Sequence, residues 1–144
     1  PFLFYGPKSH SLEEIVTETL SMDGLLLLEE GHCFRSQMLE ICRHNHGSGI
    51  PRLHYLSGSI EALKALVRKG LGYTLIPALS ANDGDQQHLR KFKTPVPTRE
   101  VSLVVHHSFV RERLLEVLRT TISESLPSEF EQNESFYKIR WRQM

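Results

Sequence analysis

The sequence predicts an α/β protein with a largely parallel sheet. Strand-like apolar runs alternate with helix-like segments along the chain, an order that is typical of α/β folds. Residues 25–28 are four consecutive leucines, the kind of run found in strands that a parallel sheet buries on both faces. At 144 residues, of which 40% are hydrophobic and 24% charged, the chain has the size and composition of one globular domain.

The first two expected elements are a strand and a helix. Residues 1–5 form a short apolar run that Gly6 and Pro7 end, so we expect an edge strand or a hinge there. Either Ser9 or Ser11 can cap the helix that follows. Its apolar residues share one helical face: Leu12, Ile15, Val16 and Leu20.

A second helix and a third strand follow the leucine run, which is itself the second expected strand. The helix covers residues 33–43 and ends at the Gly- and Pro-containing loop 45–51. Residues 53–56 predict a short strand, after which Ser57 or Ser59 caps another helix. The apolar stripe of that helix consists of Ile60, Leu63, Leu66 and Val67.

The next segment contains two expected strands around a turn. Gly70 ends the preceding helix, and residues 72–76 predict a strand that Pro77 closes. Residues 78–85 are turn-like, and residues 88–92 predict a weak strand.

The last part of the chain predicts a linker, a strand and helices. Residues 95–97, Pro-Val-Pro, indicate a stiff linker, and residues 101–106 predict a strand. Residues 109–122 predict an amphipathic helix, and the tail 127–144 a further one. The residues expected to face inward from the first of these helices are Val110, Leu114, Leu115, Val117 and Leu118.

Charge and hydropathy restrict the function classes. The chain has 17 basic and 17 acidic residues, so its net charge of zero gives no electrostatic case for nucleic-acid binding by this chain itself. The leucine run is too short to span a bilayer, and the N-terminal residues lack the features of a signal peptide. With two cysteines and no sign of secretion, we expect a cytoplasmic protein. The chain begins inside an expected strand, which indicates a piece of a longer protein.

The two cysteines, Cys33 and Cys42, fall in one predicted helix. Nine residues of α-helix advance about 13.5 Å and rotate about 900°, which places the two side chains on opposite faces. A disulfide needs Cα atoms about 4.4–6.8 Å apart. These cysteines can therefore bond only if the helix between them unwinds.

The two cysteines also differ in their surroundings. Cys33 is in the first turn, where free N–H groups and the nearby Arg35 guanidinium stabilise a thiolate. Cys42 is near the last turn, where the helix dipole disfavours a thiolate. If the pair reacts with peroxide, Cys33 is the expected attacking thiol, which becomes a sulfenic acid, and Cys42 the resolving thiol.

Two other interpretations of the cysteines are open at this point. Free cysteines are often simply buried packing residues. A zinc site is the other interpretation, because soft and borderline ligands gather in this segment. These ligands are His32, Cys33, Cys42, His44 and His46. The paired Cys-x2-Cys spacing of structural zinc sites is missing, however, and eight histidines make chance clusters common.

Two stretches resemble the LysR-type family of transcriptional regulators. Residues 25–37 read Leu-Leu-Leu-Leu-Glu-Glu-Gly-His-Cys-Phe-Arg-Ser-Gln and, with Cys42, closely resemble the hydrogen peroxide-sensing members of that family. Residues 57–77 are similar to the effector-domain signature of the whole family, which is a capped helix, a Gly-x-Gly turn and a strand ending in Pro. The resemblance covers residues 1–126.

The resemblance implies an α/β, periplasmic-binding-protein-like (type 2) regulatory domain, in which helices flank a mixed sheet in two subdomains. Residues 1–97 would be the second regulatory subdomain, which carries the redox cysteines. Residues 98–126 would be the strand and helix that return to the first subdomain, and residues 127–144 a C-terminal tail. The N-terminal winged helix-turn-helix and most of the first subdomain would be absent from this chain.

The resemblance also implies a transcription activator that detects hydrogen peroxide and switches the response to oxidative stress. Cys33 matches the peroxide-reactive cysteine of the family and Cys42 its resolving cysteine, so a reversible disulfide between them is expected. Ser36 stands where the best-known members carry Asp, so we expect different polar contacts in the reduced helix. Such a protein uses peroxide stoichiometrically, is not an enzyme, and needs neither a cofactor nor a metal.

Four further residues match positions around the reactive thiol of the family. His32 and Arg35 flank Cys33, His54 lies on the strand before the capped helix, and Arg99 lies just before the returning strand. The resemblance implies that they border the peroxide pocket and support the thiolate. From the residues alone, a histidine such as His54 in a strand is more often a half-buried structural residue, and Arg99 equally suits a surface charge.

The expected partners follow from the same resemblance. They are hydrogen peroxide, further copies of the chain in a homodimer or homotetramer, and a glutaredoxin- or thioredoxin-type thiol reductant. In the full protein they include RNA polymerase and, through the absent N-terminal domain only, DNA; we expect no membrane contact.

Two alternative functions stay open. One is a LysR-type effector domain that binds a small anionic metabolite, in which the cysteines are incidental and Ser59 lies near the ligand. The other is a thiol peroxidase, an enzyme that turns over repeatedly with a reductant.

Overall fold

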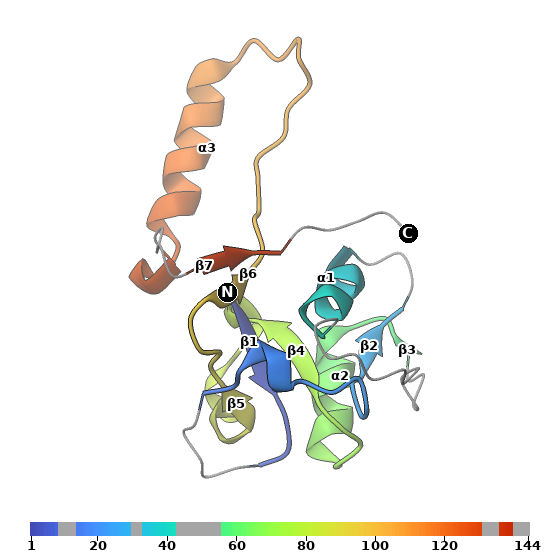
Figure 1. Ribbon diagram of the computed structural model, residues 1–144. Helices are drawn as coiled ribbons and strands as arrows, with labels where there is room; N and C mark the ends of the chain where they lie inside the picture. The colour runs from blue at the N-terminus through green and yellow to red at the C-terminus, as the bar shows by residue number, and fades with distance from the viewer. Residues whose placement is uncertain (9–13, 30–32, 43–55, 131–135, 140–144) are drawn as a thin grey trace. The chain divides into compact units, whose positions relative to one another are not determined.

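The chain forms two compact units. The computed structural model describes residues 1–8, 14–29, 33–42, 56–130 and 136–139, which Figure 1 shows as coloured ribbons. One unit comprises Pro1–Arg99 with Ser135–Met144, and the other comprises Glu100–Glu134. Among the described residues, none of the helices has the length and apolar character needed to cross a membrane.

A three-stranded sheet in the first unit has the strand order β4–β1–β5 (Figure 1). β1 (Phe2–Tyr5) pairs antiparallel with β4 (Thr74–Pro77) on one side and with β5 (Leu89–Arg90) on the other. The expected strand over residues 1–5 is therefore confirmed. An edge position for it is wrong, because both of its sides hydrogen-bond to partner strands.

The leucine run contributes a parallel strand. β2 (Leu27–Leu28) pairs in parallel with β3 (Leu56–Ser57), and all four leucines of residues 25–28 are buried. Of the strand expected over residues 53–56, only Leu56 lies in the described part of the chain. The loop expected over residues 45–51 lies entirely outside that part. Among the described residues there are one antiparallel sheet and two parallel strand pairs, so the strand pairing is mixed rather than largely parallel.

Two glycines bring the leucine run against the segment that leads into β4. Gly72 has a φ of +138°, and a Cβ there would lie 2.1 Å from the carbonyl oxygen of Gly24. The Tyr73 N–H donates to that carbonyl at 2.9 Å, and the Leu26 N–H donates to the Tyr73 carbonyl at 2.8 Å. A side chain has no room at position 72, so the second glycine of the Gly-x-Gly turn is required for this close backbone contact.

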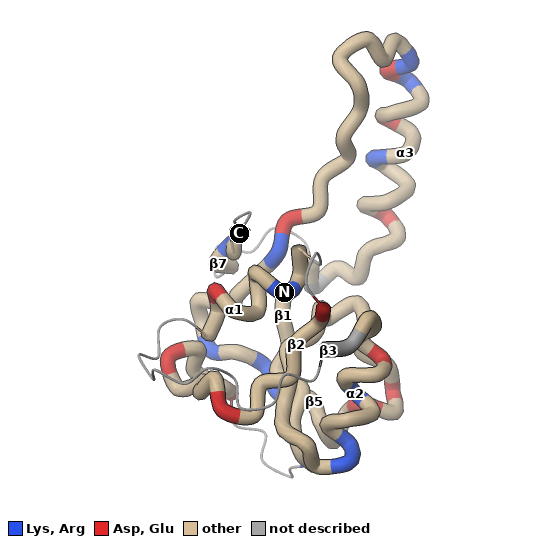
Figure 2. Tube along the Cα trace, turned by 90° about the vertical axis from the view of Figure 1, so that its right-hand side faces the viewer, with Lys and Arg blue, Asp and Glu red and all other residues tan. Residues whose placement is uncertain are grey.

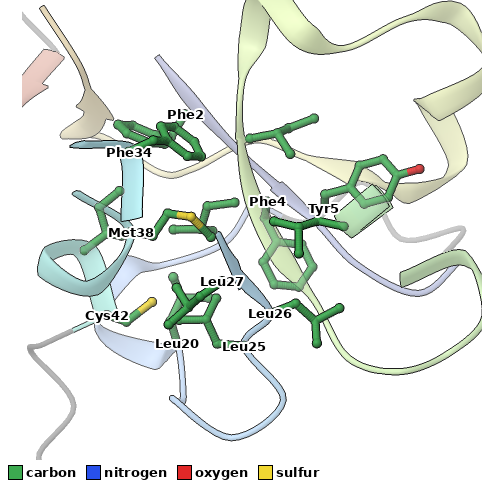
Figure 3. Close-up of a cluster of buried hydrophobic side chains, with 14 of the residues drawn as sticks. Phe2, Phe4, Tyr5, Leu20, Leu25, Leu26, Leu27, Phe34, Met38 and Cys42 are labelled. Atoms are coloured by element: carbon green, nitrogen blue, oxygen red, sulfur yellow. The ribbon is translucent and has the colours of Figure 1, made fainter. Parts of the chain in front are cut away.

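α1 (Cys33–Cys42) and α2 (Ile60–Arg68) confirm two expected helices. The Ser59 side chain accepts a hydrogen bond of 3.2 Å from the Ala62 N–H and so caps α2. Gly70, with a φ of +81°, follows the end of α2 in the conformation that favours glycine. Both helices contribute to one core of buried apolar side chains, part of which Figure 3 shows.

The segments around β4 and β5 follow the sequence closely. The strands expected at residues 72–76 and 88–92 are present as β4 and the shorter β5. The turn-like segment between them forms two 3-10 helices, Ala78–Ser80 and Asp83–His88. Asn82 caps the second of these with its side chain.

The prediction of a helix that ends at Leu20 is wrong for residues 14–20, the part of that segment that the structure describes. Residues 14–20 contain only a short 3-10 helix, Thr17–Thr19. Ile15 instead forms a parallel bridge with Phe92. Backbone pairing with a distant segment thus overrides the helical spacing of the apolar residues. Three residues of the expected helix lie outside the described part: Ser9, Ser11 and Leu12.

A further strand pair corrects two predictions about the later part of the chain. β6 (Val96–Thr98) pairs in parallel with β7 (Phe136–Lys138). The stiff linker expected at residues 95–97 is therefore wrong, since most of it belongs to a strand. The helix expected in the tail is also wrong in the described residues, which form the 3-10 helix Ser128–Phe130 and β7.

The described residues of the second unit form an extended segment, α3 (Glu112–Glu124) and the 3-10 helix Ser128–Phe130. The helix is confirmed, and charges of both signs lie along it (Figure 2). The strand expected at residues 101–106 is wrong, because no strand of the described chain pairs with it. Five side chains expected to face inward are not buried: Val110, Leu114, Leu115, Val117 and Leu118.

Candidate functional site

Cys33 is the first residue of α1, and its side chain is exposed. The Ser36 hydroxyl donates a hydrogen bond of 2.8 Å to the Cys33 carbonyl and so braces the first turn. The partial positive charge of a helix N-terminus favours an anion at this position. The thiol is therefore accessible to a small oxidant at the end of the helix where a negative charge is best tolerated.

Arg35 ties the first turn of α1 to the leucine strand. Its side chain is buried, and its Nη1 donates a hydrogen bond of 2.9 Å to the Leu28 carbonyl. Its Nε is also buried and has no hydrogen-bond partner among the described residues. A buried donor without a partner costs about 1–3 kcal/mol, so an oxygen ligand that reached this N–H would relieve that cost.

Arg99 lies beside the residue that follows Cys33. Its guanidinium carbon is 5.8 Å from the centroid of the Phe34 ring, at the distance of a cation–π contact. The Phe34 ring also stacks on Phe2, with centroids 5.2 Å apart, so the ring is held in place by the sheet. Like that of Arg35, the Arg99 Nε is buried and unpaired within the described part of the chain. The fold thus brings Arg99, which follows β6, to the first turn of α1.

The histidines of the predicted site lie outside the described residues. These are His32 and His54 of the expected peroxide pocket, and His44 and His46 of the zinc hypothesis. Within the described ranges, no three His, Cys, Asp or Glu side chains are grouped to hold a metal ion.

Cys42 is the last residue of α1 and has an environment opposite to that of Cys33. Its side chain is 0% exposed and points into the apolar cluster that includes Leu20 and Leu25 (Figure 3). Burial raises the pKa of the Cys42 thiol to about 11. Its Sγ lies 4.0 Å from the Tyr73 hydroxyl, a polar neighbour that sequence reasoning missed because it lies beyond the Gly-x-Gly turn.

α1 keeps the two thiols apart. Both cysteines are free, and the helix is continuous between them. An intact helix separates Cys33 and Cys42 along its axis by about 13.5 Å, on opposite faces. The exposed side chain of one and the buried side chain of the other agree with this geometry. A bond between the two sulfurs therefore requires α1 to unwind at least in part.

A buried cluster of charged residues was also missed by sequence reasoning. The Lys64 and Asp85 side chains are both 0% exposed and form an ion pair of 2.8 Å. Arg68 Nη2 and the Tyr5 hydroxyl donate to the other carboxylate oxygen of Asp85 at 2.7 and 2.9 Å. Burial raises the pKa of Asp85, but the hydrogen bonds from Lys64 and Arg68 outweigh it and hold that pKa well below its usual range. The available signal was the helical spacing, which places Lys64 on the inward face of α2.

Comparison with known sequences shows that the chain is similar to transcription regulators. A family model described as the LysR substrate binding domain matches residues 1–127. A probable hydrogen peroxide-inducible genes activator of Streptomyces viridosporus is 32% identical over 132 residues, which cover 87% of this chain and 42% of that protein. The hydrogen peroxide-inducible genes activator of Pectobacterium carotovorum subsp. carotovorum is 31% identical over 118 residues, covering 79% of this chain and 38% of that protein. The chain thus spans less than half the length of these relatives.

Solved structures agree with the sequence comparisons. The crystal structure of OxyR from Porphyromonas gingivalis is 32% identical, with a TM-score of 0.76 over 96% of this chain and 66% of that chain. The reduced form of the OxyR regulatory domain from Pseudomonas aeruginosa is 31% identical, with a TM-score of 0.63 over 88% of this chain and 63% of that chain. These matches confirm the expected periplasmic-binding-protein-like α/β fold.

Proposed function

This chain belongs to the family of LysR substrate-binding domains, and on that basis we propose that it is the redox-sensing regulatory part of a transcription activator that detects hydrogen peroxide. The names of its relatives, hydrogen peroxide-inducible genes activators and OxyR, support the proposal. The observation that carries it is the arrangement of the thiols. One is exposed at the start of α1, and the other is buried at the end of the same helix.

The first proposed step is oxidation of Cys33. Its thiolate attacks one oxygen of hydrogen peroxide, so that an S–O bond forms and the O–O bond breaks. The second oxygen takes up a proton and leaves as water, and Cys33 becomes a sulfenic acid. Among the described residues, the Nε groups of Arg35 and Arg99 are buried and have no hydrogen-bond partner. This supports a role for both residues in holding the peroxide oxygens. His32 and His54 complete the proposed pocket.

The second proposed step is disulfide formation. The Cys42 sulfur attacks the Cys33 sulfur, the S–S bond forms, and the hydroxyl of the sulfenic acid leaves with the thiol proton as water. This step requires α1 to unwind, because the intact helix holds the sulfurs apart. A glutaredoxin- or thioredoxin-type thiol reductant resets the pair. One peroxide is used per disulfide, and in this proposal the oxidised protein persists as a signal instead of turning over peroxide repeatedly, so it acts as a sensor and not as an enzyme.

We also propose how this chain fits into the whole regulator. Residues 1–97 form the second regulatory subdomain, residues 98–126 return to the first, and residues 127–144 are the tail. The boundary of the compact units after Arg99 supports the first division. The exposed apolar side chains of α3 support packing against the rest of a first subdomain.

In that whole regulator, unwinding of α1 repacks a homodimer or homotetramer interface. The change alters the contacts of an N-terminal winged helix-turn-helix with DNA and, through them, recruitment of RNA polymerase in the cytoplasm.

Mass spectrometry of the full-length protein that carries this chain tests the proposal. After one equivalent of hydrogen peroxide, we expect a peptide pair linked by Cys33 and Cys42, with the loss of two free thiols. The Cys33→Ser variant, the control, forms no such link. Unreacted thiols in the wild type would instead point to an effector domain that binds a metabolite. Repeated peroxide turnover with a reductant would point to a thiol peroxidase.

A further inference from the structure

The Tyr73 hydroxyl is the polar group that faces the buried thiol of α1. Its oxygen lies 4.0 Å from Cys42 Sγ, the outer limit of a hydrogen bond to sulfur. Among the described residues, no other polar side chain is recorded in contact with this thiol. The contact therefore links the last residue of α1 to the segment that leads into β4.

Counting hydrogen atoms assigns the direction of this contact. The Tyr73 hydroxyl also bonds to the Ser21 backbone carbonyl, and a carbonyl oxygen can only accept. Since the hydroxyl has one hydrogen, it donates to Ser21 and presents its lone pairs to Cys42. The Cys42 S–H is then the donor to Tyr73. The contact fits a protonated thiol, the form that burial favours.

Tyr73 is held in place without help from Cys42. Its ring stacks on Phe4 with centroids 5.0 Å apart and an interplanar angle of 20°. Its backbone N–H and carbonyl bond to Gly24 and Leu26. The hydroxyl is thus a fixed acceptor against which the end of α1 rests.

Disulfide formation requires Cys42 to leave this place, because the intact helix holds it away from Cys33. We propose that Tyr73 is a positioning residue that retains the resolving thiol in the reduced fold, so that its hydroxyl slows the disulfide-forming step. This inference rests on the proposed function. In the step concerned, the Cys42 thiol condenses with the Cys33 sulfenic acid that peroxide has produced, and one water is released. The contact with Tyr73 breaks before the S–S bond forms.

Tyr73→Phe tests the proposal in the full-length protein, because it removes the hydroxyl and keeps the ring that stacks on Phe4. We expect the rate of sulfenic acid formation at Cys33 to be unchanged. The rate of disulfide formation should rise about five-fold, the effect of losing one weak hydrogen bond. An unchanged second step would overturn the proposal.

Tyr5→Phe is the matched control. It also removes a tyrosine hydroxyl with hydrogen-bond partners, Asp85 and Arg68, but it leaves the end of α1 untouched. We expect the rate of disulfide formation to be the same as in the wild type. An equal acceleration in both variants would mean general loosening of the fold and would refute a specific role for Tyr73.

Two readouts without peroxide separate this inference from the proposed function. In the Cys33→Ser background, a small alkylating reagent should label Cys42 faster when Tyr73→Phe is added and not when Tyr5→Phe is added. The infrared S–H stretching band of Cys42, identified by its loss in Cys42→Ala, should move to higher frequency in Tyr73→Phe. Equal labelling and an unmoved band would overturn the inference even if peroxide forms the disulfide. If peroxide forms no disulfide while labelling and band both change, only the proposed function fails.

Discussion

Substitution of Met38 tests directly how α1 holds the thiols apart. It lies between the two cysteines and is 0% exposed, so it must leave the core if this part of α1 unwinds. Burial of a methionine side chain is worth about 1.5–3 kcal/mol. Met38→Ala should therefore reduce the free-energy difference between the helical and unwound states of α1 by about 2 kcal/mol. The rate of disulfide formation should then rise by about 30-fold, until the chemical step itself becomes limiting.

Rapid mixing with one equivalent of peroxide, followed by alkylation and mass spectrometry, measures both steps. Sulfenic acid formation at Cys33 should proceed at the wild-type rate, because Cys33 is exposed before α1 unwinds. Leu63→Ala is the control: Leu63 is equally buried but belongs to α2. It should lower the overall stability and leave the second step nearly unchanged. Equal acceleration by both variants, or none by Met38→Ala, would refute the reasoning.

Three further predictions concern the stability of the first unit. Asp85→Asn removes the buried counter-ion of Lys64 and leaves only the exposed Glu61 carboxylate paired with it, so urea unfolding should show a loss of about 2–3 kcal/mol; a loss below about 1 kcal/mol would contradict this. The pKa of Asp85 is lower in the folded than in the unfolded state, so its contribution is present above about pH 4 and is lost as the pH falls further. Urea titrations at decreasing pH should show this loss in the wild type and a smaller one in Asp85→Asn. Gly72→Ala sets a Cβ against the Gly24 carbonyl and should cost about 2–4 kcal/mol in the same assay. Gly58→Ala, whose Cβ would meet nothing within 4 Å, should cost less than about 1 kcal/mol.

Sequence reasoning succeeded where a local signal decides the structure. Ser59 caps α2 with its own side chain, and Gly70 takes the positive φ that follows the helix end. The helix that carries both cysteines was predicted from spacing within one segment, and the leucine run was predicted to be a parallel strand from its composition. These features depend on residues within a few positions of one another.

It failed where a distant partner decides the structure. Ile15 belongs to a set of apolar residues with helical spacing but pairs with Phe92, and the Pro-Val-Pro segment forms a strand because β7 lies beside it. Residues 101–106 have the composition of a strand, yet no described strand pairs with them.

The candidate site shows the same limit. The sequence placed Cys33, Arg35 and Cys42 on one helix, but nothing local indicates that Arg99 lies beside Phe34. The local sequence also gives no sign that Tyr73 faces Cys42, because that contact depends on how the Gly-x-Gly turn packs against the leucine run.

Hydrogen exchange of residues 33–42, measured by mass spectrometry before and after one equivalent of peroxide, tests the proposed switch most directly. In the reduced protein, the backbone amides of α1 should be protected, because the helix is continuous between the two cysteines. After oxidation, a Cys33–Cys42 link should form and that protection should be lost. A disulfide that forms while the amides of α1 keep their protection would contradict the proposal, as would a helix that peroxide leaves unchanged.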